Sequence, residues 1–171
     1  DVLESRIDHI HQPLDCRPDA PLQLHARYTR PEILMALGET KVKTATSWRE
    51  GVKWMPEQKT DVFVFTLDKS GKRFSPTTRY RDYAVSPRII HWESQSTTSA
   101  ASPTGTRYQQ HVQQGSIVLL FARLSPDDRA FWFLGPARYL SHQGERPMAI
   151  HWELEEPLPG DLLQAFGAAV A

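Results

Sequence analysis

Six short runs of β-branched and aromatic residues, separated by turn-forming residues, follow one another between residues 51 and 154. The runs are GVKWM, DVFVFTL, RIIHWES, GSIVLLFARL, AFWFLGPARYLS and MAIHWEL. Runs of this length and composition predict β-strands. No helical pattern separates them, and a parallel doubly wound sheet needs helices at those places. The sequence therefore predicts a mainly β fold with flanking helices (α+β), built on an antiparallel β-barrel.

A helix is predicted on each side of these strands. In YTRPEILMALGE, Thr29 and Glu32 have the spacing of a capping box, and Gly38 suits the left-handed residue that ends a helix. PGDLLQAFGAAV, residues 159–170, predicts a weaker closing helix whose apolar side docks on the strands. Both helices would cover the barrel rather than connect parallel strands.

The 171 residues suffice for one well-packed domain and are short for two. Residues 1–23 contain three prolines among mixed charges and predict a linker, an irregular extension from a preceding domain. Residues 24–171 are predicted to form a single β-barrel domain. The chain begins at Asp1 rather than at a methionine, so we expect that it belongs to a longer protein.

Composition limits the classes of partner. Twenty basic and twenty acidic residues give a net charge of zero, so a nucleic acid must be held by a local patch of charge. The single Cys16 cannot form an internal disulfide, and it has no second thiol for a zinc knuckle. No apolar run approaches the roughly 20 residues that span a bilayer. We expect a soluble, cytoplasmic protein with no membrane partner.

Two connections are far longer than the others, and both flank RIIHWES. They are residues 68–87 and 95–114, whereas connections of about four to six residues are typical. Long loops on a rigid β scaffold often carry binding residues. Both connections are rich in hydroxyl groups and the first is also basic, so we expect the binding site there.

The letters HWE occur in two of the predicted strands. Histidine and glutamate two positions apart share one face of a strand, so two neighbouring HWE strands could supply four metal ligands. The residues concerned are His91, Glu93, His151 and Glu153. In the alternative interpretation the two tryptophans are core residues and their neighbours are solvated. We favour this alternative and predict neither a metal site nor a cofactor, because no HExxH motif or cysteine pair supports metal binding.

Two stretches beside the third run have chemistry suited to nucleic acid. FSPTTRYRDYAVSP interleaves arginines with aromatic rings, and such groups neutralise phosphates and stack on unpaired bases. SQSTTS offers neutral amide and hydroxyl groups, which can pair with base edges. Each stretch has a structural alternative: the rings could anchor a loop with its arginines in solvent, and the hydroxyl groups could form ordinary turns.

No catalytic constellation emerges from the sequence. The GxSxG and P-loop patterns are absent, and Cys16 lies in the predicted extension. Hydrolase and nucleotide triphosphatase chemistry therefore lack their usual residues. We predict a binding domain rather than an enzyme.

Several motifs taken together resemble one bacterial family. They are LHARYTRPEILMALG, REGVKW, FSPTTRYRDYAVSP, HWESQSTTS, SPTGTRY, FLGPARY and GERPMAIHWEL, in this order from about Leu24 to about Leu163. The set resembles the C-terminal domain of helicase-containing type IV (modification-dependent) restriction enzymes of the SauUSI kind, which often carry a phospholipase-D-like nuclease.

The resemblance implies an open β-barrel of the SRA/PUA-like type that reads 5-methylcytosine or 5-hydroxymethylcytosine in double-stranded DNA. It also implies that the partners are the helicase and nuclease domains of a parent protein, since this chain carries neither. Cleavage and ATP hydrolysis would then reside outside the chain. The same loops would also suit a phosphorothioate or a glucosylated target.

From the loops we predict that a flipped cytosine enters an aromatic pocket while cations hold the neighbouring phosphates. The predicted base-pocket residues are Tyr80, Asp82, Tyr83, Trp92, Ser94, Gln95, Ser96 and Thr97. The predicted DNA-backbone contacts are Lys72, Arg73, Thr77, Thr78, Arg79, Arg81 and Arg88. Arg107 or Tyr108, in the second long connection, is predicted to fill the gap left by the base. A metal-dependent nuclease and a protein-interaction module of a helicase complex are the alternatives.

Overall fold

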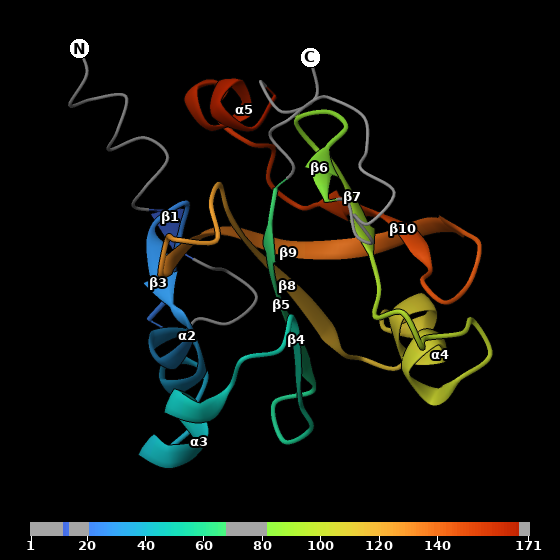
Figure 1. Ribbon diagram of the computed structural model, residues 1–171, viewed down its shortest axis with the longest axis horizontal. Coiled ribbons are helices and arrows are strands. Elements are labelled where there is room, and N and C mark those ends of the chain that lie inside the picture. The colour runs from blue at the N-terminus through green and yellow to red at the C-terminus, as the bar shows by residue number, and fades with distance from the viewer. Residues whose placement is uncertain (1–11, 14–20, 68–81, 168–171) are drawn as a thin grey trace.

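The computed structural model describes residues 12–13, 21–67 and 82–167, which form an eight-stranded sheet with four helices around it (Figure 1). The strands are β1 (Gln12–Pro13), β2 (Gln23–Leu24), β3 (Arg27–Thr29), β4 (Val52–Met55), β5 (Thr60–Thr66), β6 (Tyr83–Ala84), β7 (Ile89–Glu93), β8 (Ile117–Arg123), β9 (Ala130–Gln143) and β10 (Ala149–Leu154). The helices are α2 (Arg30–Ala36), α3 (Val42–Ser47), α4 (Pro103–Gln110) and α5 (Gly160–Gly167). Strands β1 and β2 form a separate antiparallel pair.

The predicted mainly β, α+β class is confirmed, and each of the six runs contains one strand of the large sheet. The order is β4-β5-β8-β9-β10-β7-β6, with β3 added alongside β9. The prediction of a wholly antiparallel sheet is wrong, because β5 and β8 pair in parallel from Thr60↔Ile117 to Thr66↔Arg123. Parallel neighbours require a long crossover, and β6, β7 and α4 lie within it.

The sheet curls strongly, although its ends do not meet within the described residues. Strands β4 and β6 stand at opposite ends of the strand order and do not pair, so a closed barrel is not formed there. Four strand spacings separate β5 from β7, which would be roughly 19 Å in a flat sheet. Yet the rings of Phe63 on β5 and Trp92 on β7 stack with centroids 4.3 Å apart. The sheet therefore folds back on itself and encloses its inner face.

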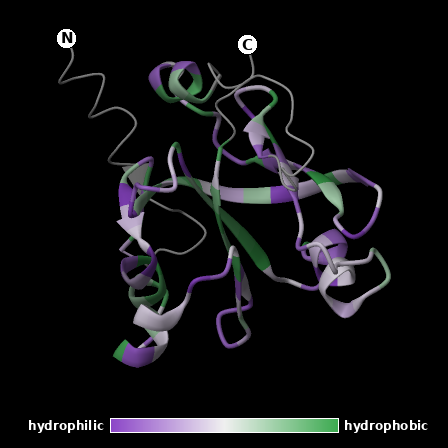
Figure 2. Ribbon diagram, in the orientation of Figure 1, coloured by the Kyte–Doolittle hydropathy of each residue, from purple (hydrophilic) through white to green (hydrophobic). Residues whose placement is uncertain are grey.

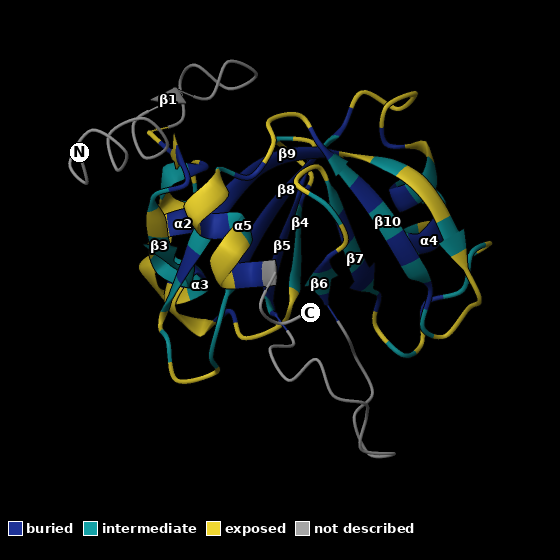
Figure 3. Cartoon of the chain, turned by 90° about the horizontal axis from the view of Figure 1, so that it is seen from above, coloured by how far each residue is buried: buried dark blue, intermediate teal, exposed yellow. Residues whose placement is uncertain are grey.

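The central strands are buried on both faces, which explains their nearly continuous hydrophobic sequences (Figure 2). Phe63 and Leu120 point into the inner core, which the other half of the curled sheet and helix α5 complete. Val64 and Phe121 point to the outer face, where a second core forms against α2 and α3. Figure 3 shows α2 and α3 at one end of the sheet and α4 at the other.

Strand β9 belongs to both halves of the curled sheet, because it bends near Gly135. This glycine has a φ of +96°, and a Cβ there would lie 2.7 Å from Cδ1 of Leu24. The pairing of β8 with β9 shifts register between Leu120 and Phe121, beside the glycine. Such irregularities bend a strand and increase its twist. One long strand thus pairs with β8 from Trp132 to Ala137, across the bend, and with β10 from Ala137 to Gln143, after it.

The two predicted helices are confirmed as α2 and α5, whereas α3 and α4 were not predicted. Thr29 and Glu32 form the expected capping box, and Gly38 has a positive φ after α2. Among the described residues no helix combines the length and the apolar character that crossing a membrane requires. The division at residue 24 stays a prediction, and Leu22, on the linker side of it, is buried in the outer core.

Candidate functional site

A pocket of about 410 Å³ opens where the curled sheet fails to close. One wall comes from β5 and the edge strand β4, and includes Val52 and Phe65. The opposite wall comes from the end of β7 and includes Trp92 and Ser94. Asp82, which precedes β6, and two arginines described below complete it. A cleft of this size on a rigid sheet is within the range of small-ligand sites.

The end of β7 supplies an aromatic and neutral polar wall. Residues of β7 alternate between half-buried and buried, so Trp92 points inward, where it stacks on Phe63. The Oγ of Ser94 accepts a hydrogen bond from the backbone N–H of Met148 at 2.8 Å. Ser94 also donates to the carbonyl of Gln95 at 3.1 Å. The bond from Met148 fixes the strand end to the segment that precedes β10, and Glu93, the last residue of β7, adds a carboxylate to the pocket lining.

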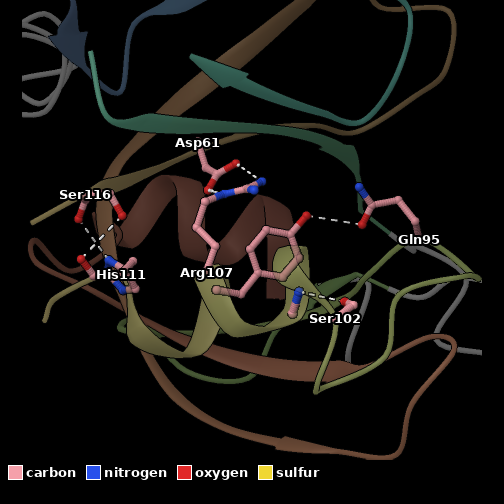
Figure 4. Close-up of polar contacts among 8 residues, drawn as sticks. Asp61, Gln95, Ser102, Arg107, His111 and Ser116 are labelled. Atoms are coloured by element: carbon pink, nitrogen blue, oxygen red, sulfur yellow. Dashed lines mark hydrogen bonds and ion pairs between the residues drawn. The ribbon is translucent and has the colours of Figure 1, made fainter. Parts of the chain in front are cut away.

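Gln95 lies at the exposed rim of this wall, and two hydroxyl groups orient its side-chain amide (Figure 4). Its Oε1 accepts hydrogen bonds from the hydroxyl groups of Tyr108 and Thr98, each at 3.2 Å. Tyr108 is fully buried on α4. No hydrogen bond in the described part of the chain uses the Nε2 of Gln95, so this amide presents a donor at the rim.

Asp82 is the buried acidic group of the pocket. It is only 8% exposed, and its Oδ1 accepts a hydrogen bond from the backbone N–H of Glu93 at 2.9 Å. Burial raises the pKa of Asp82 to about 8, and the nearby Glu93 charge adds to this effect against the hydrogen bond. At pH 7 the side chain is therefore mainly a neutral carboxylic acid, with one O–H donor and remaining acceptor sites.

The cationic part of the pocket comes from two segments far apart in the sequence. Arg30 begins α2, and Arg123 ends β8. Both guanidinium groups lie over the ring of Phe131, at 5.2 and 4.7 Å from its centroid. Arg123 also donates from Nε to the Oγ1 of Thr66 at 2.8 Å. The pocket thus combines an aromatic wall, a neutral acid and two cations.

The structure brings together some of the predicted site residues and separates others. Asp82, Trp92, Ser94 and Gln95 line the pocket, whereas Tyr83, Ser96 and Thr97 do not. Seven predicted residues lie outside the described residues: Lys72, Arg73, Thr77, Thr78, Arg79, Tyr80 and Arg81. Asp82, the first described residue after that segment, lines the pocket, and so does Thr66, two residues before the segment begins.

Two predicted residues have structural contacts elsewhere. Tyr83 stacks on His91 with ring centroids 4.6 Å apart, on the side of β7 opposite to Trp92. Arg88 donates to the backbone carbonyls of Leu154 and Glu155, at 3.5 and 2.9 Å, and so ties the start of β7 to the end of β10. Their predicted roles in base stacking and phosphate binding find no support in these contacts.

The prediction that Arg107 and Tyr108 lie on a loop is wrong, because both are on helix α4. Arg107 makes a two-bond ion pair with the buried Asp61, at 2.7 and 2.9 Å. Its guanidinium also lies over the Trp54 ring, 4.5 Å from the centroid. Tyr108 has no exposed surface. To fill a gap in DNA, either side chain would have to leave these contacts.

The two HWE strands are antiparallel neighbours, with His91 directly opposite His151. The two rings form a hydrogen bond of 3.0 Å between His151 Nε2 and His91 Nδ1. The antiparallel register places Glu93 opposite Ala149 and Glu153 opposite the other end of β7, so the two carboxylates flank the histidines on opposite sides. The four side chains therefore do not converge, and no cluster of three such ligands occurs among the described residues.

The pocket also contains residues that sequence reasoning missed, chiefly Arg30, Phe65, Arg123 and Phe131. A capped helix start and the interior of hydrophobic strands carry no local signal of binding. These residues converge only because the sheet curls. Their discovery requires the strand order, in particular the parallel pairing of β5 with β8.

His111 stabilises the base of α4 in its neutral form. Its Nδ1 lies 3.2 Å from the carbonyl of Ser116, and its Nε2 accepts the backbone N–H of Tyr139 at 3.1 Å. Burial lowers the pKa of His111 below its usual 6.5, against the hydrogen bond to Ser116 and the Asp61 charge.

We therefore expect His111 to contribute stability that is complete above pH 6.5 and is lost as the pH falls below that value. The midpoint of urea unfolding, measured from pH 8 to pH 5, should fall more steeply in the native protein than in His111→Gln. His142→Gln, a substitution at a half-buried histidine, is the control. Parallel curves for the native protein and His111→Gln would contradict the expectation.

Comparison with known proteins gives one family match. A family model described as a domain of unknown function, DUF3427, matches residues 22–166. No curated protein matches the chain. The matched range contains the whole pocket described above.

Proposed function

We propose that this chain, which belongs to the DUF3427 family of unknown function, binds DNA and reads a modified cytosine in the pocket between β5 and the end of β7. The base, 5-methylcytosine or 5-hydroxymethylcytosine, would be flipped out of the duplex. The observation that carries this proposal is that the buried Asp82 lines the same pocket as an aromatic wall and two arginines. Each part of the pocket suits one part of a nucleotide.

The apolar wall suits the flat ring. Trp92 and Phe65 come from two different strands and both line the pocket. Stacking of a base on an aromatic side chain contributes about 1–3 kcal/mol. A flipped base loses its stacking in the duplex, at a cost of a few kcal/mol, so a pocket that replaces this stacking is required.

The acid suits the pairing edge of cytosine. Cytosine carries an amino donor at N4 next to an acceptor at N3, and a neutral carboxylic acid offers the complementary acceptor and donor. Asp82 is in this neutral form at pH 7, as its raised pKa indicates. Thymine carries an acceptor and a donor in the reverse order, so the fixed side chain would favour cytosine only if its orientation is held. The hydrogen bond from Glu93 holds it.

The substituent at C5 would lie against the aliphatic part of the wall, at Val52. Burying one methyl group is worth about 0.8 kcal/mol, which is a factor of about four in affinity. Stronger discrimination would require that the wall fits a substituted ring better than an unsubstituted one. We therefore expect a modest preference from contact alone.

In the larger protein the chain would act as the specificity domain of a modification-dependent restriction system. Its sheet would be an open barrel of the SRA/PUA-like type, and helicase and nuclease domains would supply motor activity and cleavage. The chain itself would bind and not catalyse.

The test is fluorescence polarisation with matched duplexes that carry cytosine, 5-methylcytosine or 5-hydroxymethylcytosine at one position, at fixed near-physiological salt. We expect tighter binding to a modified duplex. Gln95→Ala should weaken that binding, because it removes the donor at the rim, by about 1 kcal/mol, or roughly fivefold. Gln143→Ala, an exposed glutamine at the end of β9, is the matched control and should change nothing.

Equal affinity for all three duplexes would overturn the proposal. Weak and equal binding, unchanged in Gln95→Ala, would instead favour a protein-interaction module. Metal-dependent loss of duplex length during the measurement would favour a nuclease. A fourth duplex with a tetrahydrofuran abasic site shows whether the pocket residues act on a base at all.

A further inference from the structure

A second hollow of about 520 Å³ adjoins the pocket, and Arg30 and Arg123 line both. The hollow is further lined by the exposed Arg49 and Arg129 and by Asp128. Four arginines therefore meet around one concave surface. Their positions come from α2, the segment after α3, the end of β8 and the β8–β9 connection.

Arg30 is held firmly but its charge is poorly compensated. Its guanidinium lies between the rings of Trp48 and Phe131, 5.5 and 5.2 Å from their centroids. Its Nη2 donates to the carbonyl of Arg49 at 3.2 Å. Its Nε is buried and has no hydrogen-bond partner among the described residues. No described hydrogen bond uses its Nη1.

Arg123 is fixed from two sides and keeps one nitrogen available. Its Nε donates to Thr66, and its Nη1 donates to the backbone carbonyl of Asp128 at 2.7 Å. No described hydrogen bond uses its Nη2. In both bonds the guanidinium donates to a neutral oxygen, so the bonds orient the guanidinium without neutralising it. A guanidinium with a planar face fixed in this way is suited to a tetrahedral anion.

The positive charges exceed the negative ones at this surface. Within the described residues none of the four arginines forms an ion pair. The acidic groups nearby are Asp128, Glu50 and, in the adjoining pocket, Glu93 and the mainly neutral Asp82. Burial lowers the pKa of Arg30, and the charges of Arg123 and Arg49 lower it further. Mutual repulsion of this kind is relieved when an anion binds between the cations.

We propose that Arg30 and Arg123 form a phosphate subsite that binds a phosphodiester of the DNA strand next to the base pocket, with Arg49 and Arg129 at its rim. The ligand of the whole site is then a nucleotide within a strand, rather than a free base. A phosphate oxygen would accept from Nη1 of Arg30 and Nη2 of Arg123. The inference rests on the proposed function for its DNA source, whereas the anion chemistry stands on the arginines alone.

The experiment measures the affinity for modified and unmodified duplexes at several salt concentrations. Each lost phosphate contact lowers the slope of log K against log salt by about 0.9. We expect Arg123→Gln and Arg30→Gln each to reduce the slope by about this amount and to weaken both duplexes roughly tenfold. The ratio between modified and unmodified affinities should stay unchanged, because phosphate contacts carry little sequence information.

Two further variants keep the result interpretable. Arg129→Gln removes an exposed rim arginine, so it should lower the slope without changing the urea midpoint. It therefore tests the subsite even if Arg30→Gln unfolds the chain. Arg138→Gln, on the exposed part of β9, is the control and should leave the slope unchanged. An unchanged slope in Arg123→Gln and Arg129→Gln would overturn the subsite.

The outcomes separate this inference from the proposed function. A native modified-to-unmodified ratio of one, with slopes still lowered in the arginine variants, would overturn base reading and support the phosphate subsite. A ratio above one with unchanged slopes would support base reading and overturn the phosphate subsite. A titration with inorganic phosphate, followed by ³¹P NMR, tests the other source of the anion. Loss of free phosphate binding in Arg123→Gln, with duplex affinity intact, would overturn the DNA assignment.

Discussion

Replacing Arg107 with alanine is expected to lower the free energy of unfolding by about 3–5 kcal/mol, because it leaves the buried Asp61 without its partner. Asp61 has no exposed side-chain surface, and both of its oxygens accept from Arg107 (Figure 4). Burial raises the pKa of Asp61, while Arg107 lowers it. Without Arg107, only the effect of burial and a weaker effect of His111 would act on the carboxyl.

The destabilisation should therefore depend on pH. A carboxyl whose folded pKa is raised takes up a proton on folding, so its contribution to stability is lost as the pH rises through that pKa. Urea unfolding of Arg107→Ala should show a larger deficit at pH 8 than at pH 5. A deficit below 1 kcal/mol at both pH values would contradict the expectation. Such a small value is typical of an exposed pair, and Arg138→Ala, which breaks the exposed pair with Glu153, provides that reference.

A double variant distinguishes the loss of a partner from the value of the pair. Asp61→Val combined with Arg107→Met replaces both charges by apolar groups, and such replacements are often neutral or stabilising. We expect this double variant to be more stable than Arg107→Ala. The pair also joins α4 to β5, and Tyr108 on the same helix orients Gln95. Arg107→Ala should accordingly weaken duplex binding at the rim as well.

The strands could be predicted from the sequence because burial leaves a local pattern. Alternation in MAIHWEL and the apolar run in DVFVFTL identify a half-buried strand and a fully buried one. The pairing of strands leaves no such pattern. The parallel neighbours β5 and β8 were missed because helix α4, with its Gly105 and its neighbouring threonines, has weak helical propensity. Its Ser102-Pro103 start is the signal that could have revealed it.

Some residues of the candidate site could likewise be predicted from the sequence, and others could not. Trp92 and Ser94 could be predicted because strand alternation fixes which residues point inward. Arg107 could not be assigned, because its partner Asp61 lies 46 positions away in the chain. Arg30 and Arg123 were missed for the same reason: what makes them a site is their meeting over Phe131, and only tertiary structure brings these three together.

The second large effect is expected at Asp82, where the neutral acid itself is the functional form. Asp82→Ala removes both the donor and the acceptor for the cytosine edge and should weaken binding of the modified duplex by roughly 100-fold. Asp82→Asn keeps an acceptor oxygen and a donor nitrogen in the same shape, and it cannot ionise. We therefore expect Asp82→Asn to retain most of the affinity at pH 7.

The pH dependence separates the two protonation states. Among the described residues, the charge of Glu93 disfavours ionisation of Asp82, and Arg30 and Arg123 line the same pocket. Since the pKa of Asp82 is about 8, the donor is present below pH 8 and is lost above it. Native affinity for the modified duplex should fall between pH 7 and pH 9, whereas that of Asp82→Asn should stay level. The abasic duplex, which lacks the base, corrects for any general effect of pH on DNA binding.

The stability of the folded protein should depend on pH in the same direction as the affinity for the modified duplex. A carboxyl with a raised folded pKa gives its full contribution below its usual value of 3.8, and this contribution is lost as the pH rises through about 8. Asp82→Asn removes that loss, so its urea midpoint should exceed that of the native protein at pH 9. Native affinity that stays level from pH 7 to pH 9, with Asp82→Asn as weak as Asp82→Ala, would show that the ionised carboxylate reads the base. In that case Asp82 would accept from the cytosine amino group alone, and backbone groups would have to supply the donor to N3.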